Sequence, residues 1–235
     1  MALICRLTLV ALCVAVVSMV GCSGTSKREQ SDSLLMLGMS HLMANNNQKA
    51  FVSFHEALAL DADNKEVHMA LGTVHLRLEE YARAEEYFQS AARIDPEYSE
   101  AYNNICMSKS MRKQYQEAIE YCNKALANPL YPTPEKAYYN LGRIYMTLGK
   151  YQEAASAFNN SIKRAPNFIR GYYELALAYN AMKDYGRAAE MMGVAIGLDP
   201  NFKGDRLKAE ARFRELRPTA RHPEEFNQMI EILHY

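Results

Sequence analysis

The sequence lacks most of the features that would indicate catalysis or nucleic-acid binding. Its 27 Lys and Arg residues are balanced by 27 Asp and Glu residues, without a basic block of the kind that binds a phosphate backbone. It has no tryptophan and no glycine-rich phosphate loop, and its serines are scattered without a nucleophile elbow. Its six histidines, among them His41 and His75, are not accompanied by a set of cysteines or carboxylates at metal-ligand spacing. We therefore expect that the protein is not an enzyme and that it has no cofactor, no metal site and no nucleic-acid partner.

A period of about 34 residues is the strongest pattern that the sequence does contain. A large apolar residue recurs at spacings of 34, 34, 36 and 34 residues, at Leu37, Leu71, Ile105, Leu141 and Leu175. Each unit shows the three-to-four-residue apolar spacing of two amphipathic helices. A proline ends the second helix of several units, because it lacks an N–H donor and disfavours helix before it. One such hairpin cannot bury its own apolar face, so its stability has to come from stacked neighbours.

These positions resemble the consensus of the tetratricopeptide repeat, in which Leu-Gly, Tyr, Ala, Phe, Ala and Pro occupy fixed places. His41 and His75 share the place usually held by tyrosine in the first helix of the repeat, so we expect both to be packing residues. The resemblance implies an all-α fold, a right-handed α-solenoid. We expect five repeats, at residues 31–64, 65–98, 99–134, 135–168 and 169–202. Residues 203–235 are predicted to form a degenerate sixth hairpin that caps the solenoid. The last helix of this cap has an apolar stripe, at Phe226, Met229, Ile230 and Leu233.

The N-terminal segment has a different character. Residues 1–21 combine one basic residue with a short apolar run, which is typical of a signal peptide. The run ends in SMVGC at residues 18–22, which resembles a bacterial lipobox. The resemblance implies a lipidated Cys22. Ser23 follows instead of the aspartate that tends to retain such lipoproteins at the inner membrane, which favours the outer membrane, facing the periplasm. The polar composition of the next residues predicts a flexible tether over residues 22–30. A cleaved signal with an incidental cysteine and an uncleaved anchor are the alternatives.

Five cysteines occur in the whole sequence. Cys5 and Cys13 would leave with the signal peptide, and Cys22 would carry lipid. Cys106 and Cys122 then remain, one on each predicted helix of the third repeat. In an oxidising compartment two such thiols favour a disulfide, and two buried free thiols are the alternative.

The connection after the third repeat is also irregular. Residues 128–134 contain three prolines and are two residues longer than the usual turn. They form either an exposed recognition element or a tolerated insertion.

In tetratricopeptide-repeat proteins the first helices line the concave face, and the resemblance places a candidate partner-binding groove there. The register assigns thirteen residues to this groove: Leu35, Met39, Met43, Met69, Arg77, Asn103, Met107, Met111, Tyr139, Arg143, Met146, Tyr173 and Leu177. Methionine-rich grooves suit the capture of apolar peptide segments. The alternative is that some of these side chains fill the interior. The carboxylate clamp of chaperone-binding relatives is incomplete here, because Met69, Thr73 and Asn140 replace three of its residues.

A lipid-anchored chain built almost wholly of about six such repeats resembles the pilotins of type IV pilus secretins, the PilF/PilW/Tgl-like family. The likeness covers the lipobox, the short tether, the repeat number and the overall length. It implies a non-catalytic scaffold that binds secretin subunits and promotes their assembly at the outer membrane. The alternative is a general envelope scaffold, which binds peptidoglycan hydrolases or another export or polysaccharide complex.

Overall fold

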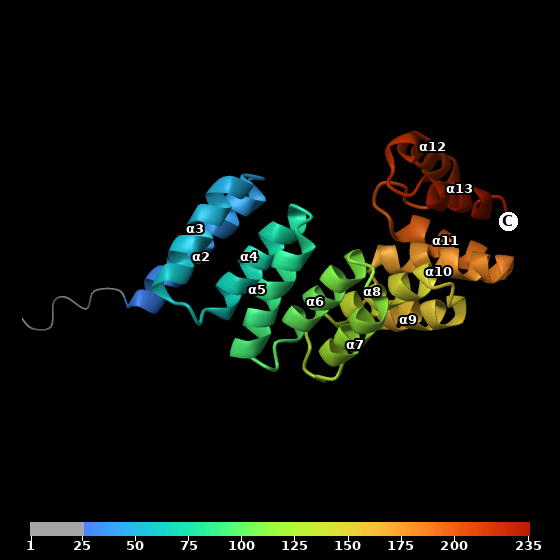
Figure 1. The fold of residues 1–235 in the computed structure, drawn as a ribbon. Helices are drawn as coiled ribbons and strands as arrows, with labels where there is room; N and C mark the ends of the chain where they lie inside the picture. The colour runs from blue at the N-terminus through green and yellow to red at the C-terminus, as the bar shows by residue number, and fades with distance from the viewer. Residues whose placement is uncertain (1–25) are drawn as a thin grey trace, which may run out of the picture. The chain divides into compact units, whose positions relative to one another are not determined.

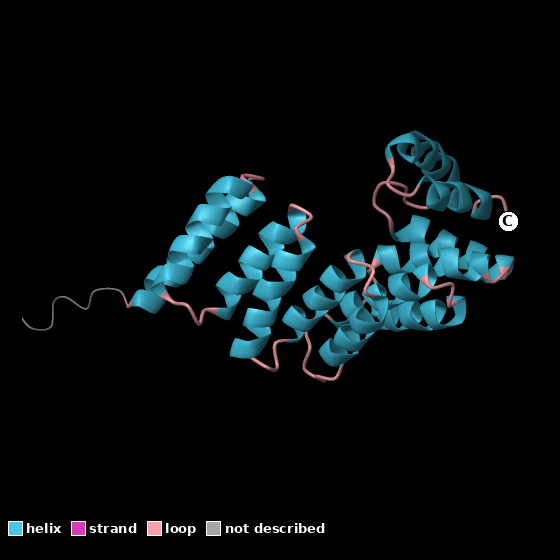
Figure 2. Ribbon diagram, viewed as in Figure 1, coloured by secondary structure: helices cyan, strands magenta, loops and turns pink. Residues whose placement is uncertain are grey.

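The computed structural model describes residues 26–235, and this part of the chain is helical throughout, with short turns and one 3₁₀ turn (Figure 2). The predicted signal peptide and Cys22 lie outside the described residues. Between residues 26 and 235 there is no β-strand, in agreement with the predicted all-α fold. No helix of this part has the length and the apolar composition needed to cross a bilayer. The chain divides into two compact units, Met1–Val74 and His75–Tyr235, which are described separately.

The helices are labelled in Figure 1. Their bounds are α2 Lys27–Met43, α3 Asn47–Leu60, α4 Lys65–Arg77, α5 Tyr81–Ile94, α6 Ser99–Met111, α7 Tyr115–Leu126, α8 Pro134–Thr147, α9 Tyr151–Arg164, α10 Ile169–Ala181, α11 Tyr185–Leu198, α12 Arg206–Leu216 and α13 Pro223–Ile232. The 3₁₀ turn, Arg217–Thr219, separates the last two helices.

The turn after the first helix of each repeat has one conformation throughout the chain. One residue in it has a left-handed backbone, with φ between 59° and 70°, at Asn45, Glu79, Lys113, Gly149 and Lys183. The next residue donates a hydrogen bond back into the first helix, as Lys150 N does to the Tyr145 carbonyl at 2.9 Å. This is the pattern of a Schellman cap. One of the five residues is glycine and one is asparagine, which tolerates this conformation, so helix packing imposes the turn on the other three side chains, which disfavour it.

The turn after the second helix is organised by side chains. Asp61, Asp95 and Asp199 each accept a hydrogen bond from the backbone N–H two residues further on, at 2.9–3.1 Å. In the irregular third repeat Asn128 does the same for Leu130, at 2.9 Å. Such Asx turns satisfy backbone donors and stop the helix.

In the first unit, α2 and α3 pack as a hairpin. Phe54 is fully buried, and its ring lies where a side chain on Gly38 would have to be. The apolar period predicts equivalent burial at Leu37 and Leu71, but Leu37 is 47 % exposed, whereas Leu71 is fully buried. The expectation is wrong for Leu37 because no helix precedes α2 within the described residues.

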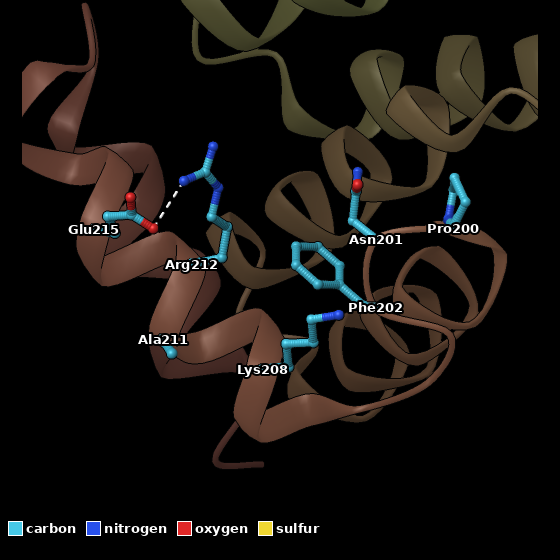
Figure 3. A pocket seen from close by; sticks show the side chains of 7 residues that line it. All are labelled: Pro200, Asn201, Phe202, Lys208, Ala211, Arg212 and Glu215. Atoms are coloured by element: carbon cyan, nitrogen blue, oxygen red, sulfur yellow. Dashed lines mark ion pairs between the residues drawn. The ribbon is translucent and has the colours of Figure 1, made fainter.

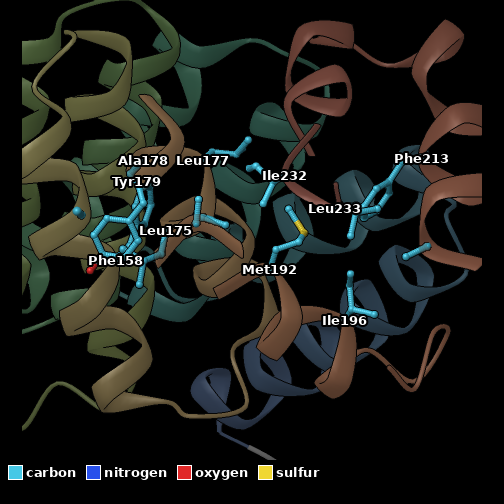
Figure 4. Packing of buried hydrophobic residues seen from close by; sticks show 14 of the residues in the cluster. Phe158, Leu175, Leu177, Ala178, Tyr179, Met192, Ile196, Phe213, Ile232 and Leu233 are labelled. Carbon is cyan, nitrogen blue, oxygen red and sulfur yellow. The ribbon is translucent and has the colours of Figure 1, made fainter. Parts of the chain in front are cut away.

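In the second unit, each first helix packs against the second helix of the preceding hairpin, as α8 does on α7 and α10 on α9. The apolar core of this unit continues into the C-terminal segment (Figure 4). Here α13, rather than α12, packs against both α10 and α11. In the capping pair, α13 therefore occupies the place that the first helix takes in a regular repeat. The first helix of the pair, α12, packs mainly against α13.

Candidate protein-interaction surface

Four residues of the predicted groove lie on the first unit. Leu35 and Met39 of α2 and Met69 of α4 are half-buried. Met43, in the last turn of α2, is 81 % exposed. These side chains contribute an apolar surface to the first unit.

The third repeat carries the most accessible groove residues of the second unit. Met107 is half-buried and Met111 is 42 % exposed, and they lie one helical turn apart on α6. Arg77, at the end of α4, is exposed. Asn103 is buried and accepts a hydrogen bond from the Asn140 amide at 2.9 Å, so it joins α6 to α8. The two methionines are therefore at least partly accessible to a partner, whereas Asn103 serves the packing of two helices.

In the fourth and fifth repeats, several of the predicted groove residues pack into an apolar core that includes the C-terminal segment. Leu177 is only 1 % exposed and belongs to the same apolar cluster as Ile232 of α13 (Figure 4). The Tyr173 ring meets the edge of Phe213 from α12, with 6.0 Å between ring centroids. Met146 packs against the same cluster. Tyr173 therefore contacts the C-terminal helices, Leu177 is buried in the core that they share with the repeats, and Met146 packs against that core.

A partly buried charge cluster joins α13 of the C-terminal segment to the repeats. The Arg143 guanidinium donates hydrogen bonds to Glu174 at 2.6 Å and to Glu225 of α13 at 3.0 Å. The Tyr139 hydroxyl donates to Glu174 at 3.3 Å. Glu174 was absent from the predicted groove, although a glutamate in an otherwise apolar stretch of a first helix is a signal that could have revealed it.

Burial governs the ionisation of this cluster. Desolvation raises the pKa of Glu174 above the ordinary glutamate value, and Arg143 opposes that shift. Burial alone would lower the pKa of Arg143, but Glu174 and Glu225 outweigh it and raise that pKa. Burial also raises the pKa of Tyr139 above the usual tyrosine range. Arg143 therefore stays charged, and its bonds to Glu174 and Glu225 hold α13 against α8 and α10.

The segment before α13 makes a further contact with an early part of the second unit. Arg221 donates a hydrogen bond to Glu79, in the turn between α4 and α5, at 2.6 Å. Both side chains are well exposed, so the pair contributes little free energy. It does show that the C-terminal segment reaches the turn at the beginning of this unit.

The structure joins Cys106 and Cys122 in a disulfide, with 5.2 Å between their Cα atoms. Both cysteines are fully buried, in a cluster with Ile119, Leu141 and Ile144. Of the two interpretations left open by the sequence, the bonded pair is the one found in the fold.

The irregular connection after α7 has one buried residue that anchors it and one residue that is exposed to solvent. Tyr131 is 5 % exposed, and burial raises its pKa to about 12. The neighbouring Leu130 is 84 % exposed. The Asn128 amide donates a hydrogen bond to the Glu97 carbonyl at 3.1 Å, which holds the loop against the preceding repeat. The loop therefore presents one apolar side chain from a fixed base.

No group of three or more His, Cys, Asp or Glu side chains within residues 26–235 is arranged to hold a metal ion.

Comparison with known sequences identifies the repeats. Models of the tetratricopeptide repeat match residues 35–99, 135–168 and 169–202. The type IV pilus assembly protein PilF of Pseudomonas aeruginosa is 27 % identical over 135 residues, which are 57 % of this chain and 54 % of PilF. The peroxisomal targeting signal receptor of Kluyveromyces lactis is 32 % identical over 106 residues, 45 % of this chain and 18 % of the receptor. The matched region thus spans about half of one curated relative and less than a fifth of the other.

Comparison with solved structures gives the same fold. A structure of Pseudomonas aeruginosa PilF has a TM-score of 0.68 and 24 % identity, covering 86 % of this chain and 97 % of PilF. PilW, described as a widely conserved type IV pilus biogenesis factor, also has a TM-score of 0.68, with 23 % identity over 85 % of this chain and 98 % of PilW. YrrB, a tetratricopeptide-repeat protein with a peptide-binding site, has a TM-score of 0.54 and 21 % identity, covering 76 % of this chain and 90 % of YrrB. Together with the repeat matches, these structures confirm the predicted solenoid, and this chain is a tetratricopeptide-repeat protein similar to PilF and PilW of type IV pilus assembly.

Proposed function

We propose that this protein is a lipid-anchored, non-catalytic scaffold that promotes the outer-membrane localisation and multimerisation of a type IV pilus secretin. The similarity to PilF, a type IV pilus assembly protein, is the observation that carries the proposal. The lipobox-like sequence at residues 18–22 supports the anchor, with Cys22 as its lipidated residue.

The two methionines of α6, of which Met111 is exposed and Met107 is half-buried, support a role in binding. Met107 and Met111 offer flexible, polarisable side chains, and Arg77 adds a positive charge to the same unit. A secretin segment with apolar side chains would complement the two methionines. The groove residues of the fourth and fifth repeats that pack into the apolar core take no part in that contact.

The test is deletion of the gene, followed by detection of heat-resistant secretin multimers in membrane fractions. We expect the multimers to disappear while secretin monomers persist, and to return when the wild-type gene is supplied. Complementation with Cys22→Ser separates anchoring from binding. This variant should bind secretin in extracts but fail to restore multimers in the outer membrane.

Normal multimers in the deletion strain would overturn the proposal. The general envelope scaffold, which binds peptidoglycan hydrolases or another export or polysaccharide complex, would then become the hypothesis to test. Hydrolase activity in membrane fractions of the same strain would be the next measurement.

A further inference from the structure

Positive charge is concentrated in residues 203–221. This segment contains seven Lys and Arg residues and three Asp and Glu residues within 19 positions, although the two kinds balance over the whole chain. Its net charge is therefore 7 − 3 = +4. The expectation of a chain without a basic block is wrong for α12 and the turns on either side of it.

The three acidic residues of this segment all have partners. The Asp205 side chain caps α12 by accepting a hydrogen bond from Lys208 N at 3.0 Å. Glu210 pairs with Arg214 at 2.6 Å, and Glu215 pairs with Arg212 at 2.7 Å. Within residues 26–235, four cations of the segment have no carboxylate at ion-pair distance: Lys203, Arg206, Lys208 and Arg217. Their charge is available to a partner.

A recess of about 500 Å³ lies beside these cations, between α12 and the turn that follows α11 (Figure 3). One face of α12 lines it with side chains three and four residues apart, at Lys208, Ala211, Arg212 and Glu215. Pro200 and Asn201 line the opposite side.

The floor of the recess is fixed. Phe202 lies between the turn and α12, is 7 % exposed, and packs edge-on against Phe213 with 5.7 Å between ring centroids (Figure 3). Two left-handed residues, Lys203 and Gly204, reverse the chain directly after it. An aromatic ring that is held in this way offers a preformed apolar contact to an incoming side chain.

The position of α12 explains why this face is unoccupied by the chain itself. Its apolar side, with Ala209 and Phe213, is buried. Because α13 takes the stacking position on α10 and α11, the other side of α12 faces solvent. Leu207, which is 80 % exposed, extends the apolar contact next to the unpaired cations.

We infer that the face of α12 and the recess beside it bind an acidic peptide segment that carries an aromatic side chain. Carboxylates of the segment would pair with Arg206 and Lys208, and its aromatic ring would enter the recess against Phe202. An anionic lipid surface would match the cations equally well. The recess favours the peptide, because a flat membrane surface uses neither an apolar floor nor a side-chain-sized hollow. This site is independent of the secretin-binding face proposed on α6.

The test is fluorescence anisotropy with a labelled synthetic peptide of four glutamates around one central phenylalanine. The full chain is held in micelles of an uncharged detergent at low salt. The double variant Arg206→Glu/Lys208→Glu should bind about tenfold or more weakly, since it reverses both charges that the peptide would meet. The matched control, Lys163→Glu/Arg164→Glu on α9, makes the same change in net charge at two other exposed positions and should bind like the wild type. Equal weakening in both variants, or no binding by the wild type, would overturn the proposal.

Two further arms test the recess. Ala211→Phe fills it from an exposed helix position and should weaken the phenylalanine peptide several-fold, without affecting a peptide in which glycine replaces the phenylalanine. Micelles that contain phosphatidylglycerol are then added to displace the labelled phenylalanine peptide from the protein. If these micelles displace it completely and the glycine peptide binds as well as the phenylalanine peptide, the surface is a general anion-binding face and the inference is wrong.

Discussion

The third and fourth repeats fill the same space in two different ways. In the fourth repeat the Phe158 ring lies where a side chain on Gly142 would have to be, and the ring is fully buried. In the third repeat the equivalent positions are Cys106 and Cys122, which form a disulfide. A large ring over a glycine has thus been replaced by two medium side chains and a covalent bond.

Because of this difference, the stability of the fourth repeat depends on packing and the stability of the third repeat depends on the oxidation of its cysteines. The fourth repeat is stable as soon as its neighbours stack on it, because its contact is apolar. The third repeat reaches its full stability only where a disulfide forms, in an oxidising compartment. It also carries Met107 and Met111, so the condition applies to the hairpin that presents the proposed binding face. The predictions below test this comparison, beginning with the largest effect.

Phe158→Ala should give the largest loss of stability. The side chain is fully buried, so its removal leaves a cavity between α8 and α9 and should lower the free energy of unfolding by about 3–5 kcal/mol. Urea unfolding followed by circular dichroism measures the change. Tyr185→Ala, at a position that is 46 % exposed, is the control and should change little. Similar losses in the two variants would show that the ring does not hold the hairpin.

Cys106→Ala/Cys122→Ala should lower the free energy of unfolding by about 3 kcal/mol, because the closed loop of 16 residues is no longer fixed in the unfolded chain. Reduction of the wild type should have a similar effect, whereas a reductant should leave the double variant unchanged. If the reductant leaves the wild type unchanged as well, the bond does not contribute to the stability of the third repeat.

Glu174→Gln should remove a pH dependence that belongs to the fifth repeat. Burial raises the folded-state pKa of Glu174 above its ordinary value of 4.5, so the folded chain keeps a proton that the unfolded chain loses. The contribution of Glu174 to the free energy of unfolding is therefore complete below about pH 4.5. It decreases as the pH rises towards the folded-state pKa, by at most about 1.4 kcal/mol per pH unit. Thermal unfolding between pH 4 and pH 8 should show a flatter profile for the variant than for the wild type. The exposed control Glu120→Gln should retain the wild-type profile, and parallel profiles in all three proteins would refute the assignment.

Cys106→Gly/Cys122→Phe should have the smallest effect, since it transfers the pair of the fourth repeat into the third. We expect a stability within about 1.5 kcal/mol of the oxidised wild type and no response to a reductant. Unfolding in urea with and without the reductant measures both properties. A variant as unstable as Cys106→Ala/Cys122→Ala would show that the two repeats are not interchangeable at this contact.

Much of the fold follows from residues that recur with the period. Leu71, Ile105, Leu141 and Leu175 are all 5 % exposed or less, because stacking on a preceding hairpin is what the repeat pattern encodes. The turn residues could not be predicted in the same way. Glu79 and Lys113 do not favour a left-handed backbone, and the packing of their helices imposes it.

The candidate surface was predictable only in part. Met111 is exposed as the register implies, but Leu177 is buried in the apolar cluster that includes Ile232 of α13. The apolar stripe of α13 could be read from the sequence, whereas its destination could not, because about 50 residues separate it from α10. The total charge of the chain also gave no sign of the positive charge on α12, because an equal number of acidic and basic residues over the whole chain conceals a local excess of cations.

The most direct test of the proposed scaffold is the recovery of heat-resistant secretin multimers in a deletion strain complemented with Met111→Glu. Met36→Glu, at a position that is 70 % exposed and outside the predicted groove, makes the same chemical change and is the control. With equal amounts of folded protein, we predict that Met111→Glu fails to restore the multimers and that Met36→Glu restores them. Full recovery with Met111→Glu would contradict the account, because the face of α6 would then play no part in secretin assembly.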